Sequence, residues 1–214
     1  MRWNSGIASI AALLGIASEA YADVFVDGET GFTFSQYSAA YTTTSSVIFR
    51  VAIPSTAAAG TPYDVVIQVV APVAAGWAAL AWGGSMTNNP LTIGWSNGNS
   101  ALASVRRATS HTTPQPFDGA TLEILTTGTK TNATHWQYTA KCTGCSSFVG
   151  SNDAQKNLDP KGSNRFAFAY SKTKPTTPSS DTTAITVHDV YNYWNHDFAA
   201  AANANFDELV EKNL

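Results

Sequence analysis

Charged residues are scarce in this sequence, and they are nearly balanced in sign. The 214 residues include 12 lysines and arginines against 15 aspartates and glutamates, so 13% are charged and the formal net charge is −3. Nucleic acids and anionic membranes select proteins with clustered positive charge. The composition therefore gives no reason to expect nucleic acid or a membrane as a partner.

Long apolar runs are also missing. The run over residues 7–17 is too short to span a bilayer, and no later segment approaches the necessary length. Because this run follows Arg2 and ends at small residues of the A-x-A type, it predicts a secretory signal peptide, residues 1–22, cleaved after Ala22. An amphipathic first helix of the mature fold is the alternative. We expect a secreted, extracellular protein whose residues 23–214 form one domain.

Cysteine is limited to Cys142 and Cys145, with two residues between them. In a secreted chain such a pair favours a small disulfide loop. Ser146 stands where covalent haem attachment needs a histidine, no second Cys/His pair completes a zinc site, and no βαβ pattern supports a thioredoxin-like motif. Secretion also agrees with the sequon at Asn132, which predicts N-glycosylation on an exposed turn.

Helical periodicity is almost absent before the C-terminal end, and short β-like runs alternate with Gly, Pro, Asn and Ser. The clearest strands are residues 47–53 and 63–70. Further candidate strands are residues 77–82, 91–95, 102–106, 122–127, 135–141, 165–170 and 184–188. So many short strands fit two packed sheets better than one open sheet, which would leave a face and two edges uncovered. The sequence predicts an all-β, antiparallel sandwich with polar loops, among them a mobile surface loop at residues 172–183.

One helix is expected near the C-terminus. Helical spacing relates Phe198, Ala202, Phe206, Leu209 and Val210, with Asn195 or Asp197 as a candidate N-cap. This short helix should pack on the sandwich.

Methionine is as rare as cysteine, and the one that is not the initiator is Met86, in the turn-forming stretch Trp82-Gly-Gly-Ser-Met-Thr-Asn-Asn-Pro. His188 ends an apolar run and is followed by Asp189, a possible supporting or surface group, and by aromatic residues beginning at Tyr191. A thioether and an imidazole together are the axial pair of haem iron in electron-transfer cytochromes. The pair predicts a haem-binding redox domain.

Each residue also has a plainer interpretation. A lone methionine is often a gap-filler in a core, and a histidine at a strand end is often buried and satisfied. His196 competes as the ligand, but Asn-His-Asp there is typical of the polar start of a helix, so we favour His188. His111, in a polar loop, is a candidate contact for a haem propionate, with an exposed loop histidine as the alternative. His135 is assigned to a strand surface without a role.

A set of motifs in a fixed order carries a family resemblance. It consists of Gly76-Trp77 leading to residues 82–86, Asn-Gly-Asn at 97–99, Arg106 or Arg107 before Ala-Thr-Ser-His and Pro114, Trp136 leading to Cys142 and Cys145, residues 166–170, and His188-Asp189. Over nearly the whole mature chain the sequence resembles the haem b cytochrome domain of fungal cellobiose dehydrogenase and related extracellular iron-reductase domains, which are allied to the DOMON sandwiches.

The resemblance implies an immunoglobulin-like β-sandwich with non-covalent haem b at one end. It implies Met86 and His188 as axial ligands and a disulfide between the paired cysteines; we add His111, Trp82 and Tyr191 as further cofactor contacts. Family members often have tyrosine near a propionate where this chain has Ser110 and His111. With both axial positions filled, the domain should transfer electrons without substrate chemistry of its own.

The resemblance also implies partners. Such domains accept single electrons from a sugar dehydrogenase, with a flavin or quinone cofactor, and pass them to acceptors such as copper lytic polysaccharide monooxygenases in fungal lignocellulose degradation. The chain lacks a G-x-G-x-x-G motif, so it should act as part or partner of such an oxidoreductase.

A carbohydrate-binding β-sandwich without a redox cofactor is the alternative, suggested by six tryptophans and eight tyrosines. However, the tryptophans at 77, 82, 95 and 136 lie within strand patterns and are expected in the core. A copper monooxygenase would need an N-terminal histidine, and the expected mature start is Asp23.

Overall fold

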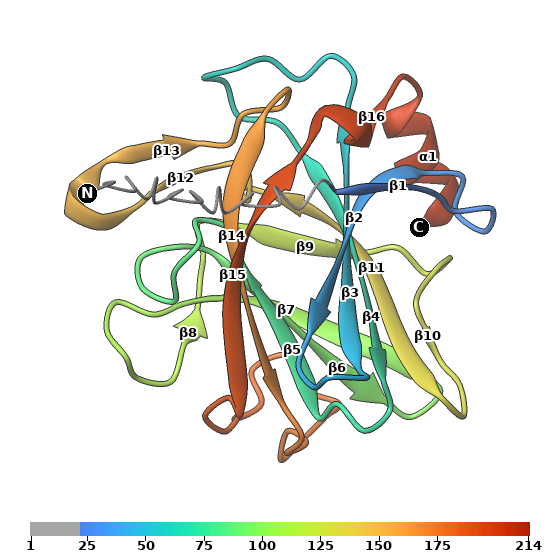
Figure 1. The fold of residues 1–214 in the computed structure, drawn as a ribbon, viewed down its shortest axis with the longest axis vertical. Helices are drawn as coiled ribbons and strands as arrows, with labels where there is room; N and C mark the ends of the chain where they lie inside the picture. The colour runs from blue at the N-terminus through green and yellow to red at the C-terminus, as the bar shows by residue number, and fades with distance from the viewer. Residues whose placement is uncertain (1–21) are drawn as a thin grey trace, which may run out of the picture.

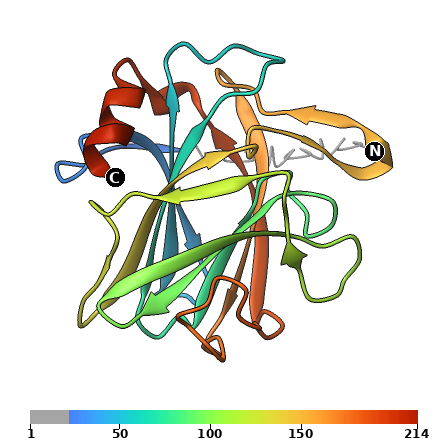
Figure 2. The ribbon, with the colours of Figure 1, turned by 180° about the vertical axis from the view of Figure 1, so that it is seen from behind.

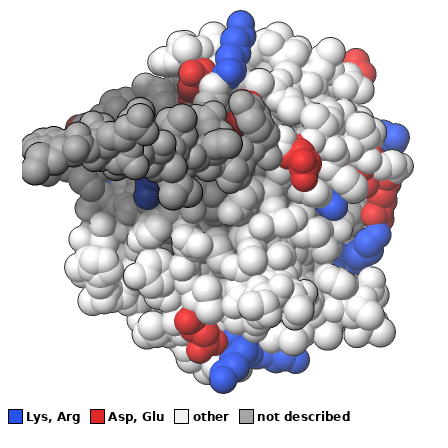
Figure 3. Space-filling view, in the orientation of Figure 1, with Lys and Arg blue, Asp and Glu red and all other residues white. Residues whose placement is uncertain are grey.

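The computed structural model describes residues 22–214, which form two β-sheets packed face to face (Figures 1 and 2). The predicted signal peptide lies outside the described residues, apart from Ala22. The predicted antiparallel sandwich with one short C-terminal helix is confirmed. Figure 3 shows the charged side chains of one face in small, separate groups of mixed sign, as the composition leads one to expect.

The eight-stranded sheet has the order β1-β2-β3-β4-β11-β10. These strands are β1 (Asp23–Val26), β2 (Thr33–Ala40), β3 (Ser46–Pro54), β4 (Val65–Pro72), β11 (His135–Thr143) and β10 (Lys130–Thr131), with β9 (Thr121–Ile124) beside β11 and β16 (Ala202–Asn203) beside β3. Only the short pair of β16 with β3 is parallel among the named strand pairs of the described residues. In antiparallel sheets one face can pack on the core while the other faces solvent.

The six-stranded sheet has the order β15-β14-β5-β6-β7-β8. Its strands are β15 (Val190–Asp197), β14 (Ser163–Ser171), β5 (Trp77–Ala81), β6 (Leu91–Asn97), β7 (Ser100–Arg107) and β8 (Gln115–Pro116). A separate hairpin of β12 (Ser147–Val149) and β13 (Gln155–Asn157) projects beside it (Figure 1).

The inner faces of the two sheets form the main core. Alternation along β3 and β4 buries Phe49 and Val69 against residues of β5 and β14, where Trp82, which follows β5, meets Phe166 edge to face at 5.4 Å between ring centroids. The sheets approach closely at Gly94, where an added Cβ would lie 2.2 Å from the ring of Tyr138. Because successive side chains of a strand point to opposite faces, every second residue of these strands is buried in the core, and this alternation predicts the strands from the sequence.

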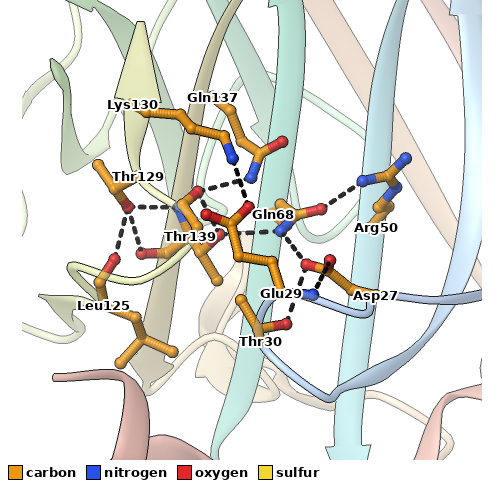
Figure 4. Close-up of polar contacts among 11 residues, drawn as sticks. Asp27, Glu29, Thr30, Arg50, Gln68, Leu125, Thr129, Lys130, Gln137 and Thr139 are labelled. Carbon is orange, nitrogen blue, oxygen red and sulfur yellow. Dashed lines mark hydrogen bonds and ion pairs between the residues drawn. The ribbon is translucent and has the colours of Figure 1, made fainter. Parts of the chain in front are cut away.

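The outer face of the eight-stranded sheet is covered by α1 (Phe206–Asn213), whose Phe206, Leu209 and Val210 bury Ala52 and Val66. Beside this apolar patch lies a polar network (Figure 4). Its members, from several strands and loops, are Asp27, Thr30, Arg50, Gln68, Thr129, Gln137 and Thr139.

The buried centre of this network is the carboxylate of Asp27. It accepts hydrogen bonds from the Thr30 hydroxyl and the Gln68 amide, both at 2.9 Å, while Gln68 also donates to Thr139 at 3.0 Å. Gln68 accepts in turn from Arg50. Because buried polar groups are costly when unpaired, this closed set of bonds stabilises the face it occupies.

Three sequence predictions are wrong. Residues 184–188 form no strand; they lie in a loop, and the strand that follows, β15, begins at Val190. The C-terminal helix begins at Phe206 rather than after Asn195 or Asp197, because β15 runs through these positions with its inner side chains in the core. His196 is therefore part of a strand and does not start a helix.

The loop at residues 172–183 is fastened to the six-stranded sheet. The Trp95 indole donates to the Pro178 carbonyl at 2.8 Å, and Arg106 donates to the carbonyls of Asp181 and Thr183, both at 2.8 Å. These contacts hold the segment that leads to His188.

Candidate functional site

The outer face of the six-stranded sheet carries a cavity of about 360 Å³. A volume of this size lies within the range of small-molecule sites. Its floor consists of residues from the strands β5, β6 and β14, namely Trp77, Ala79, Ala81, Leu91, Ile93, Ala167 and Ala169. The floor is apolar throughout.

Four alanines on this floor leave room for the cavity, because their side chains are short. Pairing of β14 with β5 sets Ala167 opposite Ala81 and Ala169 opposite Ala79, so the four side chains are neighbours on one face. The other face of the same strands carries large core residues such as Leu80 and Phe166. Since successive side chains of a strand point to opposite faces, the small residues are confined to the cavity side.

The rim comes from segments far apart in the sequence. It includes Ser85, Met86 and Thr87 from the loop after β5, His111 and Pro114 from the loop after β7, Ile185 and His188 from the loop before β15, and Tyr191 and Tyr193 from β15. Met86 and His188 are both half-buried. The structure thus brings the predicted thioether and imidazole to one cavity, together with His111 and Tyr191.

Trp82 is not part of this site. Its side chain is fully buried on the inner face of the sheet and packs on Phe166, whereas the cavity lies on the outer face. The reason is strand parity, because Trp82 follows Ala81 and so points the opposite way. We therefore correct its assignment as a cofactor contact.

His188 is held through its neighbour Asp189. The Asp189 carboxylate accepts hydrogen bonds from the Lys172 amide at 2.8 Å and the Ser171 hydroxyl at 3.0 Å, and its own N–H donates to the Tyr170 carbonyl at 2.8 Å. The Lys172 N–H, followed by the Ser171 hydroxyl, lowers the pKa of Asp189. The loop before β15 is thereby fixed at the end of β14.

Aromatic side chains follow His188 along the rim. The ring of His188 meets that of Tyr191 edge to face at 5.0 Å between centroids, and Tyr191 meets Tyr193 at 5.9 Å. Arg165 lies over the Tyr193 ring at 5.1 Å. Tyr191 and Tyr193 are exposed, so they form the outer wall of the cavity on the β15 side.

His196, the rival candidate ligand, lies on the inner face and is fully buried. The Trp194 indole donates to its Nδ1 at 3.0 Å, and its Nε2 lies 3.2 Å from the Ser35 carbonyl, so Nε2 carries the proton. Burial lowers the pKa of His196 to about 4. Both nitrogens are used inside the core, and the alternation of Trp194, His196 and Phe198 was the sequence signal for this.

The remaining predicted residues lie away from the cavity. Cys142 and Cys145 are joined in a disulfide at the end of β11, with 5.7 Å between their Cα atoms. Asn132 is exposed in the turn between β10 and β11, and its glycosylation stays a prediction. His135 is exposed at the start of β11, as expected.

Two kinds of feature are absent from residues 22–214. None of their helices is long and apolar enough to cross a membrane. No group of three or more histidine, cysteine, aspartate or glutamate side chains among them could hold a metal ion. All five tryptophans in this part of the chain are buried, which confirms the prediction that those at 77, 82, 95 and 136 build the core.

Comparison with known proteins assigns this sandwich to a class of cytochrome domains. The sequence profile of one family, the cytochrome domain of cellobiose dehydrogenase, matches residues 25–208, and the chain belongs to this family. The crystal structure of the cytochrome b domain of pyranose dehydrogenase from Coprinopsis cinerea is similar, with 27% identity and a TM-score of 0.77 over 90% of this chain and 95% of that one.

Two further similarities agree with this assignment. The cytochrome domain of Myriococcum thermophilum cellobiose dehydrogenase shares the fold, with a TM-score of 0.79 and 21% identity over 90% of this chain and 96% of that chain. Pyrroloquinoline quinone-dependent pyranose dehydrogenase of Coprinopsis cinerea is 28% identical over 99% of this chain. The chain spans 28% of the length of that curated relative.

Proposed function

We propose that the cavity binds haem b without a covalent link, with the Met86 sulfur and the His188 imidazole as its axial ligands, and that the domain relays single electrons. The observation that supports this proposal is that both side chains line one apolar cavity although they are far apart in the sequence. The donor set suits haem iron, since a thioether with an imidazole is the axial pair of electron-transfer cytochromes.

The cavity also suits a flat, largely apolar ring. The alanines at 79, 81, 167 and 169 leave a low floor, and apolar side chains of β5 and β6 surround it. When bound, haem supplies an iron that accepts and returns one electron. The apolar floor of the cavity would exclude water, and its rim would hold the sulfur and the imidazole in place. With both of these as ligands, no position on the iron would be left for a substrate.

Polar groups at the rim have a separate task in this proposal. Ser85, Thr87 and His111 line the cavity, and His111 is exposed at its mouth. Their hydroxyl and imidazole groups can donate hydrogen bonds to the acidic propionate side chains of haem. Tyr191 lines the cavity on the β15 side, where it would cover the porphyrin ring of the haem.

For the wider setting, we propose that the domain is secreted and works in fungal lignocellulose degradation. A sugar dehydrogenase with a flavin or quinone cofactor would be the electron donor, which the relatives support because they are cytochrome domains of sugar dehydrogenases or carry one. Copper lytic polysaccharide monooxygenases would be acceptors. Contacts of this kind are small and short-lived.

The test is an absorption spectrum of the purified full chain with haem, oxidised and then reduced. We expect a low-spin, six-coordinate spectrum, which Met86→Ala and His188→Ala should change or abolish. His135→Ala is the matched control, because His135 is an exposed histidine away from the cavity. Unchanged spectra in both cavity variants would overturn the ligand assignment, and colourless protein that fails to take up haem would overturn the function.

The direction of electron flow is tested separately. Oxidised wild-type protein mixed with a sugar dehydrogenase and its sugar should be reduced, and later addition of a copper monooxygenase should reoxidise it. The protein without haem is the control for direct transfer between the two enzymes. A haem that stays oxidised in the first step would contradict the proposed donor.

A further inference from the structure

The loop that carries Met86, residues 82–90, contains almost no regular structure, yet it must hold a sulfur atom at the cavity. The side chain of Asn89, which is 1% exposed, lies inside this loop. Its Nδ2 group donates to the carbonyl of Ser85 at 2.9 Å, to the hydroxyl of Ser85 at 2.7 Å and to the carbonyl of Thr87 at 2.8 Å. One amide therefore ties together the two residues that flank Met86.

The orientation of this amide is fixed from the hairpin. Lys156 on β13 donates from its Nζ to the Oδ1 of Asn89 at 3.3 Å. An ammonium group attracts the amide oxygen and repels the amide nitrogen, so Nδ2 is turned towards the carbonyls of the loop. Gly83 leaves room for this side chain, because a Cβ added there would lie 1.7 Å from Oδ1.

The backbone of the loop is bent to match. Gly84 has φ +75° and Asn88 has φ +57°, both in the left-handed region. The Asn88 N–H donates to the Ala108 carbonyl at 2.7 Å, which fastens the end of the loop to the segment after β7. Between these two points the buried Asn89 side chain holds the loop together. Its amide donates hydrogen bonds to the carbonyls of the residues before and after Met86.

We propose that Asn89 is the positioning residue for Met86, and that its amide keeps the thioether at the cavity when the iron could exchange it for another ligand. This inference rests on the proposed haem function. A thioether is a neutral and weak ligand, so its occupancy depends on how closely the loop holds it. Loss of a residue that orients a metal ligand commonly lowers metal affinity or activity by about 10-fold to 100-fold.

The test uses the full chain with haem in its reduced state, exposed to carbon monoxide. Carbon monoxide binds the iron of a six-coordinate haem only when a protein ligand leaves, so its binding rate measures ligand displacement, and comparison with Met86→Ala assigns that displacement to Met86. Wild-type protein should bind it slowly and Met86→Ala rapidly. Asn89→Ala and Asn89→Asp should bind it at least about tenfold faster than wild type, since each removes the Nδ2 donors.

Asn88→Gly is the matched control. It removes the neighbouring asparagine side chain, whose contact is one exposed 3.5 Å hydrogen bond to Ser151, and glycine accepts the left-handed backbone. This variant should bind carbon monoxide at the wild-type rate. Rates for both Asn89 variants equal to wild type would overturn the inference, and so would an Asn88→Gly rate equal to that of Asn89→Ala.

A second measurement avoids haem altogether. In the cofactor-free protein, amide hydrogen exchange at residues 84–88 should be at least about tenfold faster in Asn89→Ala than in wild type, with the core strands unchanged. Equal acceleration everywhere would show a general loss of stability and would overturn the positioning role.

The two proposals fail in different ways. A wild-type chain that takes up no haem overturns the function and the inference with it. A Met86→Ala variant with the wild-type carbon monoxide rate overturns the assignment of Met86 as a ligand, and the inference with it. Met86 ligation with unaffected Asn89 variants overturns the inference alone.

Discussion

The two outer faces of the sandwich are built differently. On the eight-stranded sheet, α1 covers Ala52 and Val66, and a polar network centred on Asp27 lies beside them. On the six-stranded sheet, four alanines and a few larger apolar residues lie under a cavity of about 360 Å³. The first, which we call the closed face, is covered in part by a helix of the chain itself, whereas the second, the open face, carries a cavity with an apolar floor.

This difference separates stability from binding. The closed face and the inner core bury their apolar side chains against other parts of the chain, so these contacts do not depend on a group in the cavity. The open face carries the two residues proposed as haem ligands, Met86 and His188. Substitutions on the two faces should therefore move two different measured quantities, the free energy of unfolding and the affinity for haem.

The largest expected effect is on the open face. Ala79→Phe would place a ring on the cavity floor and should reduce haem affinity by at least about 100-fold, because the cavity would be filled. Ala52→Phe, the matched change under α1, should destabilise the fold by about 1–3 kcal/mol with unchanged haem affinity of the folded protein. Haem titration and urea unfolding of both variants are the measurements. Loss of haem binding in both variants would contradict the idea that one face determines stability and the other haem binding.

The core between the faces should respond to pH through His196. Its pKa is about 4 in the fold and 6.5 when unperturbed, so the unfolded chain takes up a proton first as the pH falls. Stability should be complete above about pH 6.5 and decline by about 3 kcal/mol towards pH 4. Urea unfolding of cofactor-free protein across this range should show the decline, and His196→Gln should lack that part of it. Parallel curves for the two proteins would contradict the prediction.

A smaller loss is expected at the centre of the closed face. Asp27→Ala leaves the Gln68 amide and the Thr30 hydroxyl without their acceptor and should cost roughly 2 kcal/mol of unfolding free energy. Haem affinity should stay the same, because these groups lie on the outer face of the eight-stranded sheet, whereas the cavity lies on the outer face of the six-stranded sheet. Weaker haem binding by the folded variant would show that the two faces are coupled.

The smallest effect is expected at the edge of the same network (Figure 4). Glu29 pairs with Lys130 there, and both side chains are largely exposed, at 41% and 50%. Glu29→Gln should change the unfolding free energy by less than about 0.5 kcal/mol, since exposed ion pairs are screened by water and salt. A loss as large as that of Asp27→Ala would mean that the edge and the centre act as one unit.

The sequence predicts the sandwich well where burial alternates. In β3, Val47, Phe49 and Val51 face the core in turn, and the strand was found at nearly its true bounds. The same rule fails at residues 184–188, where Ile185 contacts the cavity while Val187 is 83% exposed. Their spacing imitates a strand although no neighbouring strand pairs with them.

The edge strand β15 was missed for the opposite reason. Its outward side chains are Tyr191, Tyr193 and Asn195, which conceal the inward alternation of Trp194 and His196. Edge strands often carry such side chains, so hydrophobic alternation alone does not reveal them. The helix start is placed too early because Phe198, which directly follows this strand, belongs to the core and not to a helix.

The candidate site was found only in part. Met86 and His188 were accessible because both residue types are rare in this chain and carry chemistry. The alanine floor and the Asn89 amide were not found, since alanine has no distinctive chemistry and asparagine is expected in any turn. A weak signal existed in β5, where small residues occupy both alternating positions of a buried strand.

The cavity on the exterior of the six-stranded sheet has a consequence for maturation. If this cavity binds haem as proposed, the group would cover the outside of a sheet instead of joining the interior, so the polypeptide could acquire it after reaching its final shape. A cell that runs short of iron porphyrin would then accumulate an intact, colourless precursor, ready for later activation.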